Sequence, residues 1–362
     1  MVGGGGFGGV WVNRFLPAFA DRVQVVGLVE INPETLARGG DALGLPDSAR
    51  FTEMEEGFAR TEADFCVIVL QPHLRWRAVK LAVANGMAVL AEKPIADTWE
   101  TSLAILRLAR SSGTKLSVVQ NYRYSRRIRT LKSVLDSGQL GRINAIHARF
   151  AADYTIHTAG GAFRHQIPHA MLYEGAVHHF DQFRNLADAD GAWIAGHQWN
   201  PAWSTFGNPT TALFLLTMTN GIACQFEMNH VARGRQAGWH HEWYRVECEH
   251  GDVLVDETDV VRIEEHLGGD RLRMTEVAPV TAAYEDHHWV IDEFLSWLEG
   301  GPVPVTNAED NIYTAALSFA AVDAVQSGAS VDIQAKADAG LAAIAAGSDA
   351  ESVLDLGLVA GA

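Results

Sequence analysis

The first third of the chain alternates short apolar runs with segments of helical character, and this alternation limits the possible folds most strongly. The apolar runs are residues 23–29, 64–70, 87–91 and 115–120, and the predicted helices between them begin near Pro33, after His73 and near Thr98. Continuous apolar runs separated by helices are typical of parallel strands that are buried on both faces. The pattern predicts a doubly wound α/β fold, whose ligand binds beyond the carboxyl ends of the strands.

A glycine-rich loop opens the chain. Gly3, Gly5 and Gly8 match G-x-G-x-x-G, in which missing side chains allow a tight turn and bring a pyrophosphate close to a helix N-terminus. Glu30 ends the first long apolar run, about 20 residues further on, where an acid binds the hydroxyls of an adenosine ribose. The alternative is a flexible Gly-rich terminus. The dinucleotide site that we predict includes Gly3, Gly5, Gly6, Phe7, Gly8 and Glu30.

The other predicted strands also end in residues that carry chemistry. These residues are Gln71, His73, Glu92, Lys93 and Asn121. Because the carboxyl ends of parallel strands share one edge of a sheet, we expect all five residues to lie at the cofactor. A lysine beside a nicotinamide ring can take part in proton chemistry, so the turn Glu92-Lys93-Pro94 is a predicted catalytic element.

The strand expected before the glycine loop is short. Only Met1 and Val2 precede the glycines, whereas such a strand needs about five residues. Two explanations remain, a translation start upstream of Met1 or a shortened central strand with a weakened cofactor site. We expect the upstream start.

From about Arg142 the pattern changes to alternating apolar and polar residues, which predicts a largely antiparallel sheet. The alternating runs are 143–150, 212–218, 222–228 and 244–248, and Asn220-Gly221 favours a hairpin between the second and third. Helices near 289–298 and 311–326 are expected to pack on the first domain. We therefore predict a nucleotide-binding domain at 1–122, an α+β domain with an open sheet at 123–333 and an Ala/Gly-rich tail at 334–362.

Residues 171–184 predict a helix with chemical groups on one side. At about 100° per residue, Glu174, His178 and Asp181 share a stripe opposite Leu172 and Phe180. We expect the side chains of that stripe to be exposed rather than packed in the core, and His179 to point toward the apolar side of the helix. One alternative is an ordinary surface pair of Glu174 and His178.

A metal site is a second alternative for this segment, because imidazoles four residues apart can share a helix face. The candidate ligands are His165, His169, Glu174 and His178. Pro168 and Gly175 disfavour one continuous helix through them, so we predict no metal ligand.

Composition excludes several classes of protein. The net charge of −16 argues against a nucleic acid partner, and the basic cluster at Arg123, Arg126, Arg127 and Arg129 is expected to be a solvated helix start. Three widely spaced cysteines make neither a disulfide framework nor a zinc pattern. No signal peptide and no apolar run of about 20 residues is present. We expect a cytoplasmic protein with no membrane partner.

Taken in order, these motifs resemble the glucose-fructose oxidoreductase and inositol dehydrogenase family (Gfo/Idh/MocA). The resemblance rests on the glycine loop and on residues 71–73, 91–94, 121–124, 137–141, 174–181 and 306–310, and it covers nearly everything to about Ile333. It implies an N-terminal Rossmann domain and a C-terminal domain whose open sheet is used in oligomerisation, as a homodimer or homotetramer. It also implies NAD(P)-dependent oxidation or reduction of sugars, cyclitols or related polyols.

The resemblance also implies roles for single residues. Lys93 corresponds to the family lysine near the nicotinamide and the reacting hydroxyl, and His178 corresponds to the acid/base histidine. Glu174 stands where many members have Asp, so it either contacts substrate or orients His178. Lys93, Arg123, Glu174 and His178 are the expected substrate-binding residues, and Lys93 and His178 are expected to converge on one hydroxyl.

The sequence favours a dehydrogenase that uses NAD, because an acid at Glu30 repels the 2′-phosphate of NADP. Two alternatives stay open. One is an NAD-dependent enzyme that cleaves glycosides through transient oxidation, and the other is a non-catalytic nucleotide-binding sensor or regulator.

Overall fold

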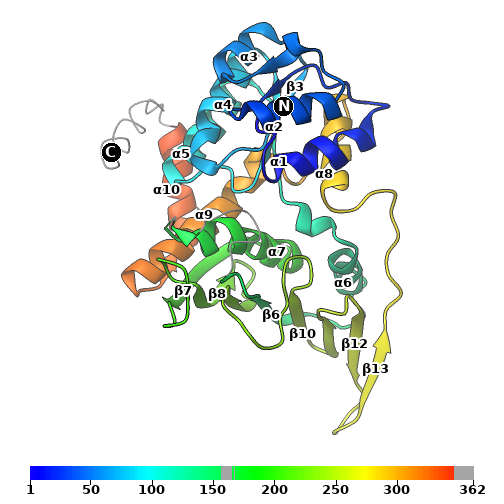
Figure 1. The fold of residues 1–362 in the computed structure, drawn as a ribbon. Helices are drawn as coiled ribbons and strands as arrows, with labels where there is room; N and C mark the ends of the chain where they lie inside the picture. The colour runs from blue at the N-terminus through cyan, green and yellow to red at the C-terminus, as the bar shows by residue number, and fades with distance from the viewer. Residues whose placement is uncertain (156–164, 167, 346–362) are drawn as a thin grey trace. The chain divides into compact units, whose positions relative to one another are not determined.

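The computed structural model describes residues 1–155, 165–166 and 168–345, and its chain divides into two compact units (Figure 1). The first unit contains Met1–Gln120, His287–Ile312 and the residues from Ala339 onward. The second contains Asn121–Asp286 and Tyr313–Asp338. The end of the predicted Ala/Gly-rich tail, at 346–362, lies outside the described residues.

The strands of the first unit form a parallel sheet. Strand β1 (Leu28–Val29) pairs with β2 (Arg50–Phe51), while β4 (Ala88–Glu92) lies between β3 (Phe65–Ile68) and β5 (Leu116–Val119). Val2 connects the two groups, because it forms parallel bridges to both Val29 and Ile68. This order, with Val2 at its centre, confirms the predicted doubly wound sheet.

Two helices of the first unit begin at side chains that cap them. The helices are α1 (Gly8–Val10), η1 (Trp11–Phe15), η2 (Pro17–Phe19), α2 (Pro33–Ala42), η3 (Asp47–Ala49), α3 (Met54–Arg60), α4 (Pro72–Ala84), α5 (Trp99–Ser112) and α8 (Asp286–Leu298). Asn32 caps α2 by accepting the Thr35 N–H, and Thr98 caps α5 by accepting the Thr101 N–H. The helix starts predicted near Pro33 and Thr98 are therefore confirmed.

The second unit is built on a mixed sheet. Within the described residues its order is β13-β12-β11-β10-β6-β9-β8-β7-β14, and β6 and β9 are the parallel neighbours. The strands are β6 (Ile143–Ala151), β7 (Gly191–Trp199), β8 (Thr211–Met218), β9 (Ala223–Asn229), β10 (Trp243–Cys248), β11 (Gly251–Val255), β12 (Val261–His266), β13 (Leu272–Glu276) and β14 (Val331–Asp332). Gly221, with φ of 89°, closes the predicted hairpin between β8 and β9. The expectation of a largely antiparallel open sheet is confirmed.

Helices complete the second unit. They are η4 (Asn121–Tyr124), α6 (Arg126–Asp136), η6 (Met171–Ala176) and α7 (Val177–Ala187), while α9 (Ala308–Ser327) and α10 (Ile333–Ala345) have residues in both units. Figure 1 shows α7 against the sheet, and its Phe180 ring lies 5.7 Å from Phe214 and 5.8 Å from Phe226. These three rings are fully buried and form the core of this unit.

Two predicted elements differ from the structure. The strand expected over residues 23–29 is limited to Leu28–Val29. Val2 pairs with Val29, and residues 23–27 do not pair with the Met1–Gly3 segment. The helix expected over 171–184 is π-helical in η6 before it becomes α-helical in α7. None of the described helices has the length and apolar character that crossing a membrane requires.

We predict that Phe226→Ala lowers the free energy of unfolding by about 3 to 5 kcal/mol, because it removes a ring that is fully buried between α7 and the sheet. Gln225→Ala is the matched control, since the neighbouring side chain on β9 points to the exposed face. It should change stability by no more than about 0.5 kcal/mol. Denaturant unfolding checks both variants, and equal losses would contradict the assignment of the two faces.

Candidate functional site

The glycine loop of the first unit has a backbone that excludes side chains. A Cβ atom on Gly3, where φ is 90°, would lie 2.1 Å from the Val69 carbonyl oxygen. A Cβ on Gly8 would lie 2.2 Å from the Gly3 carbonyl oxygen. At Gly6 the φ angle is 53°, and no described atom lies within 4 Å of a Cβ placed there. The loop thus requires glycine and leaves space above Gly6, as a phosphate-binding turn must.

Glu30 lies directly beside this loop. Its Oε2 atom accepts hydrogen bonds of 2.8 Å from the backbone N–H groups of Gly4 and Gly5, and its Oε1 accepts one of 2.9 Å from Asn32. The predicted ribose-binding carboxylate and the predicted phosphate loop are therefore adjacent. Backbone amides beside a hydrogen-bond-accepting carboxylate fit the adenosine half of a dinucleotide.

The remaining strand-end residues have different surroundings. Gln71 precedes α4 as its N-cap residue, and both Gln71 and His73 are exposed. Asn121 begins η4, is buried and clusters with the second unit. The structure thus brings together the glycine loop and Glu30 in the first unit, whereas cofactor contacts from Gln71, His73 and Asn121 stay predictions.

Glu92 is a buried carboxylate at the end of β4. The indole N–H of Trp11 donates a hydrogen bond of 2.9 Å to its Oε1, and His287 Nε2 lies 3.4 Å from the same atom. Burial alone would raise the pKa of Glu92, but His287, Lys93 and Trp11 together hold it below its ordinary value. The carboxylate is therefore an anion that joins the glycine-loop helix, β4 and α8.

Arg75 fixes the backbone at the same strand end. This buried guanidinium on α4 donates to the carbonyl oxygens of Leu70, Glu92 and Lys93. It thereby holds the segments after β3 and β4 together and fixes the backbone position of Lys93, whose side chain is partly buried.

The sequence analysis did not identify Arg75, Trp11 or His287 as site residues. The burial of Arg75 was predictable from the sequence. The buried residues Ala78, Val79 and Ala82 follow it by three, four and seven positions, which places all four on one face of α4. No spacing pattern links His287 to Glu92, since the two residues are far apart in the chain.

Asp181 anchors α7 in the second unit. Its carboxylate accepts two hydrogen bonds from Arg123, of 2.7 and 2.8 Å, and one of 2.9 Å from the Thr314 hydroxyl. Arg184 donates to Thr314 in turn. All four side chains are buried. Arg123, which we expected to contact substrate, thus forms a bidentate ion pair inside the unit, and a substrate contact through it stays a prediction.

His178 lies in a pocket of aromatic side chains. Its ring stacks on Tyr122 at 3.9 Å with an interplanar angle of 10°, and the Trp239 ring lies 6.0 Å away. The stripe of Glu174, His178 and Asp181 is less open than expected, since only Glu174 is partly exposed. Partners cover the other two, and the i→i+5 hydrogen bonds of η6 change the angular spacing at Glu174.

His179 points to the opposite side, as the helical phase predicted. It is fully buried, stacks on Phe226 at 4.7 Å, and its Nδ1 lies 3.3 Å from the Gly175 carbonyl oxygen. Burial lowers the pKa of His179 to about 3, so the ring is neutral. Among the residues that the structure describes, no three His, Cys, Asp or Glu side chains are grouped so that they could hold a metal ion.

Glu242 is a buried acid that the sequence analysis missed. The backbone N–H of His240 donates to its Oε1 at 3.0 Å, and Tyr122 is near enough to lower its pKa slightly. His179 Nε2 lies 3.9 Å from the same oxygen. Burial raises the pKa of Glu242 to about 7, against the opposing effect of Arg127. Glu242 can therefore exchange a proton near neutral pH, and Tyr122 connects it to His178.

We predict that Glu242 makes the protein less stable as pH rises. A folded-state pKa of about 7, above the ordinary 4.5, means that the folded protein binds the proton more tightly. The stabilisation is complete below pH 4.5 and is lost as pH rises through 7, and it amounts to about 3 kcal/mol.

Glu242→Gln keeps the acceptor for His240 and cannot titrate. Its free energy of unfolding, measured by denaturant between pH 5 and pH 8, should lack that loss. Parallel pH curves for the variant and the parent protein would show that Glu242 titrates normally.

Comparison with known families gives two matches. A model of the oxidoreductase family with an NAD-binding Rossmann fold matches residues 1–120, and a model of the GFO/IDH/MocA C-terminal domain matches residues 128–254. The two matches follow each other along the chain without overlap. Together they cover more than half of it, including the glycine loop, Lys93 and His178.

Individual proteins match over nearly the full length. An uncharacterised protein, y4oX of Sinorhizobium fredii, is 35% identical over 342 residues, which are 92% of this chain and 94% of that protein. D-apiose dehydrogenase of Paraburkholderia graminis is 21% identical over 87% of this chain and 84% of its own.

Solved structures share the fold. An oxidoreductase from Agrobacterium radiobacter in complex with NAD+, L-tartaric acid and magnesium superimposes with a TM-score of 0.78 at 20% identity, over 92% of this chain and 97% of that chain. The family model over residues 1–120 describes a Rossmann fold, which agrees with the glycine loop and the strand order described above. The chain therefore belongs to the Gfo/Idh/MocA family of oxidoreductases, whose N-terminal domain is an NAD-binding Rossmann fold.

Proposed function

We propose that this chain is a dehydrogenase that transfers hydride between a hydroxyl-bearing carbon of a sugar, cyclitol or related polyol and NAD. The observation that carries the proposal is the network around Glu92. Through Trp11 and Arg75 it links the backbone of Lys93 to the helix that follows the glycine loop. The backbone of a lysine is thereby fixed in the same unit as the dinucleotide loop.

The residues of the first unit are suited to hold NAD. The backbone of residues 3–8 would hold the pyrophosphate, and Glu30 would accept hydrogen bonds from the adenosine ribose. When bound, NAD supplies a nicotinamide ring that accepts or gives a hydride.

The chain's own residues handle the proton and the charge on the substrate. We assign Lys93 to stabilise the oxygen of the hydroxyl as it becomes an alkoxide. We assign His178 to take the hydroxyl proton, because an unprotonated imidazole nitrogen can accept a proton from a hydroxyl in reach. Tyr122 orients the His178 ring by stacking on it. Asp181 and Arg123 hold α7 in place.

We predict that Lys93→Ala and His178→Ala each lower turnover by about 10² to 10⁴, the usual contribution of a positioned acid or base. Folding and NAD affinity should stay close to those of the parent protein. Lys93→Arg should not restore turnover, because a guanidinium is larger and keeps its proton. Steady-state kinetics and calorimetric NAD titration measure these two effects separately.

His179→Ala is the matched control for His178→Ala. It removes a fully buried imidazole from the apolar side of the same helix, so it should lower the thermal midpoint. The turnover of the protein that stays folded should be close to that of the parent. An inactive His179 variant beside a fully active His178 variant would contradict the assignment.

We predict a preference for NAD over NADP. In this proposal Glu30 binds the ribose, and a 2′-phosphate would place negative charge against its carboxylate. Glu30→Gln should narrow the difference between the dissociation constants of NAD and NADP. The variant replaces the carboxylate by an uncharged amide of the same size, which removes that repulsion. Tenfold tighter binding of NADP by the parent protein would rule out this role.

The substrate class follows from the relatives and the chemistry together. One relative is named for D-apiose, and one similar structure holds L-tartaric acid, so both names contain a compound with several hydroxyl groups. A panel of sugars, cyclitols and polyols with NAD, followed at the absorbance of reduced nicotinamide, tests the proposal. Cleavage of a glycoside without net reduction of NAD would favour the glycoside-cleaving alternative instead.

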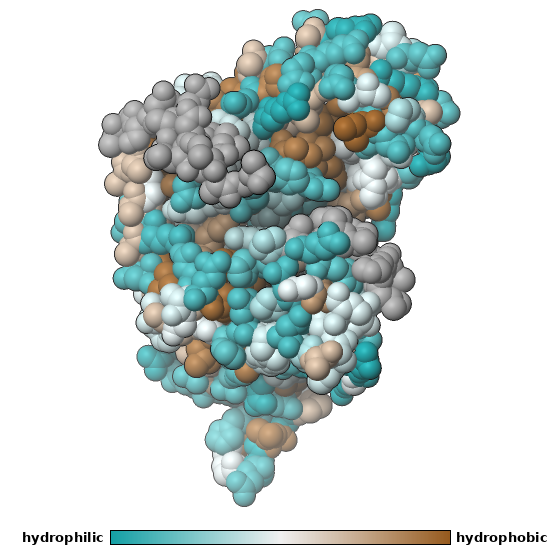
Figure 2. All heavy atoms as spheres, turned by 60° about the vertical axis from the view of Figure 1, so that its left-hand side comes forward, coloured by the Kyte–Doolittle hydropathy of each residue, from teal (hydrophilic) through white to brown (hydrophobic). Residues whose placement is uncertain are grey.

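We also propose that the protein is a homo-oligomer that associates through the open face of its second-unit sheet. Trp193 of β7 and Leu213 and Leu215 of β8 are exposed, by 41%, 44% and 59%, on neighbouring strands. Figure 2 shows that hydrophilic residues surround the apolar patches on the face in view. Light scattering should give a dimer or tetramer at micromolar concentration, and Leu213→Glu with Leu215→Glu should reduce it to a monomer. A monomeric parent protein would refute this proposal.

A further inference from the structure

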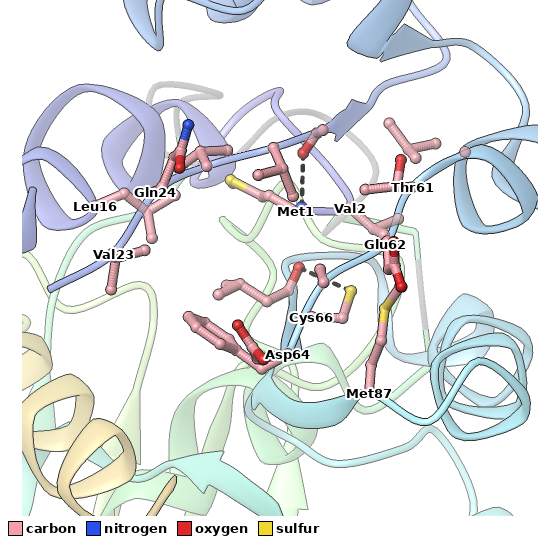
Figure 3. A pocket seen from close by; sticks show the side chains of 18 of the residues that line it. Met1, Val2, Leu16, Val23, Gln24, Thr61, Glu62, Asp64, Cys66 and Met87 are labelled. Atoms are coloured by element: carbon pink, nitrogen blue, oxygen red, sulfur yellow. Dashed lines mark hydrogen bonds between the residues drawn. The ribbon is translucent and has the colours of Figure 1, made fainter. Parts of the chain in front are cut away.

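A cavity of about 310 Å³ in the first unit lies away from the predicted cofactor residues. Figure 3 shows it beside Met1 and Cys66, at the amino ends of β1 and β3. Glu30 follows β1 and Glu92 ends β4, so both lie at the opposite, carboxyl edge of the sheet. This cavity is therefore no substrate site, and further groups that bind substrate hydroxyls are expected around His178 in the second unit.

His240, in the second unit, has a backbone conformation that a residue with a Cβ atom rarely adopts. Its φ angle is 66°, in the left-handed region that favours glycine. Glu242 Oε1 accepts its N–H at 3.0 Å, Arg127 donates to its carbonyl oxygen at 2.9 Å, and the Tyr122 ring lies 4.5 Å from its imidazole. Strain of this kind persists only where surrounding contacts impose it, and it is concentrated at functional sites.

The imidazole of His240 belongs to a group of three rings around the proposed base. Tyr122 stacks on His178 and also contacts His240, so one phenol ring joins the two imidazoles. His178 and Tyr122 are buried, whereas 43% of the His240 side chain is exposed. Solvent, and a ligand dissolved in it, can therefore reach the His240 ring.

A purely structural role does not account for an imidazole at this position. Glycine would adopt the φ angle without strain and would keep both backbone hydrogen bonds. It would lose the ring contact with Tyr122 and the approach of His240 Nδ1 to Asp286 Oδ1, which at 3.8 Å exceeds hydrogen-bond distance. Neither contact is a strong source of stability, so the chemistry of the imidazole is the feature that requires an explanation.

We propose that His240 is a substrate-binding residue, which hydrogen-bonds to a second hydroxyl of the sugar, cyclitol or polyol on which His178 acts. This role rests on the dehydrogenase function proposed above. A neutral imidazole has one donor and one acceptor nitrogen, and a hydroxyl both donates and accepts, so the two groups match. The substrate must then carry a second hydroxyl close to the reacting one, and compounds that lack it should bind more weakly.

Deoxy analogues test this pairing. The probes are D-glucose, D-xylose and myo-inositol with their monodeoxy analogues, titrated by calorimetry into the protein with reduced NAD bound, so that no turnover is needed. His240→Ala should raise the dissociation constant of a probe about tenfold, the usual effect of one lost hydrogen bond. It should not change the dissociation constant of the analogue that lacks the paired hydroxyl, whereas a structural role would weaken both compounds equally.

Two further variants control for folding. His240→Gly relieves the left-handed φ angle, so its thermal midpoint should be no lower than that of His240→Ala, while both variants weaken binding equally. His241→Ala removes the neighbouring exposed imidazole, whose Nδ1 lies 3.2 Å from Asp259, and should leave binding unchanged. Unchanged binding by both His240 variants, an equal loss for every deoxy analogue, or no binding of any probe to the parent protein would overturn the proposal.

Turnover separates this role from the dehydrogenase activity. Weaker probe binding by both His240 variants, without reduction of NAD by any compound that binds, would refute the dehydrogenase and keep His240 as a ligand-binding residue. Reduction of NAD with an unchanged KM in both variants would refute the role of His240 and keep the dehydrogenase.

Discussion

The buried carboxylate of Glu92 is the interaction on which the chemistry of the first unit depends. Three segments far apart in the chain meet at this side chain through Trp11, His287 and the strand β4 itself. A buried anion is stable only when partners compensate for lost hydration, and removing one partner of such a pair costs about 3 to 5 kcal/mol. The contacts that satisfy Glu92 therefore fix the helix after the glycine loop and α8 at the end of β4, and Arg75 holds the backbone of Lys93 there separately.

The second unit uses buried polar groups in the same way. Asp181 satisfies Arg123 and Thr314, and this holds α7 against η4 and α9. Glu242 accepts a hydrogen bond from the His240 N–H, and the nearby Tyr122 ring stacks on His178. Each unit thus holds a buried carboxylate near one of the two residues to which we assign a catalytic role, Lys93 and His178.

Local patterns were sufficient to predict most elements of the fold. The helix starts near Pro33 and Thr98, the hairpin at Gly221 and the alternation along β8 and β9 all depend on neighbours in sequence, and the structure contains each of them. The turn after β4 was also predictable, because an apolar run ends there in charged residues.

Contacts between distant residues could not be predicted in this way. No periodicity connects His287 with Glu92 or Glu242 with Tyr122, since each pair forms only when the chain folds. The π-helical turn of η6 changed the spacing that placed Glu174 beside His178. Burial of His178 and Asp181 depends on Tyr122, Arg123 and Thr314, which come from other segments.

Direct transfer of hydride from a substrate carbon is the central claim, and an isotope experiment tests it most directly. A sugar or polyol that reduces NAD in the panel is prepared with deuterium on the carbon that carries the reacting hydroxyl. Mass spectrometry of the reduced cofactor should find one deuterium per molecule, because the C–H bond breaks and its hydride moves to NAD. Reduced cofactor without deuterium, or substrate cleaved while NAD stays oxidised overall, would contradict the account.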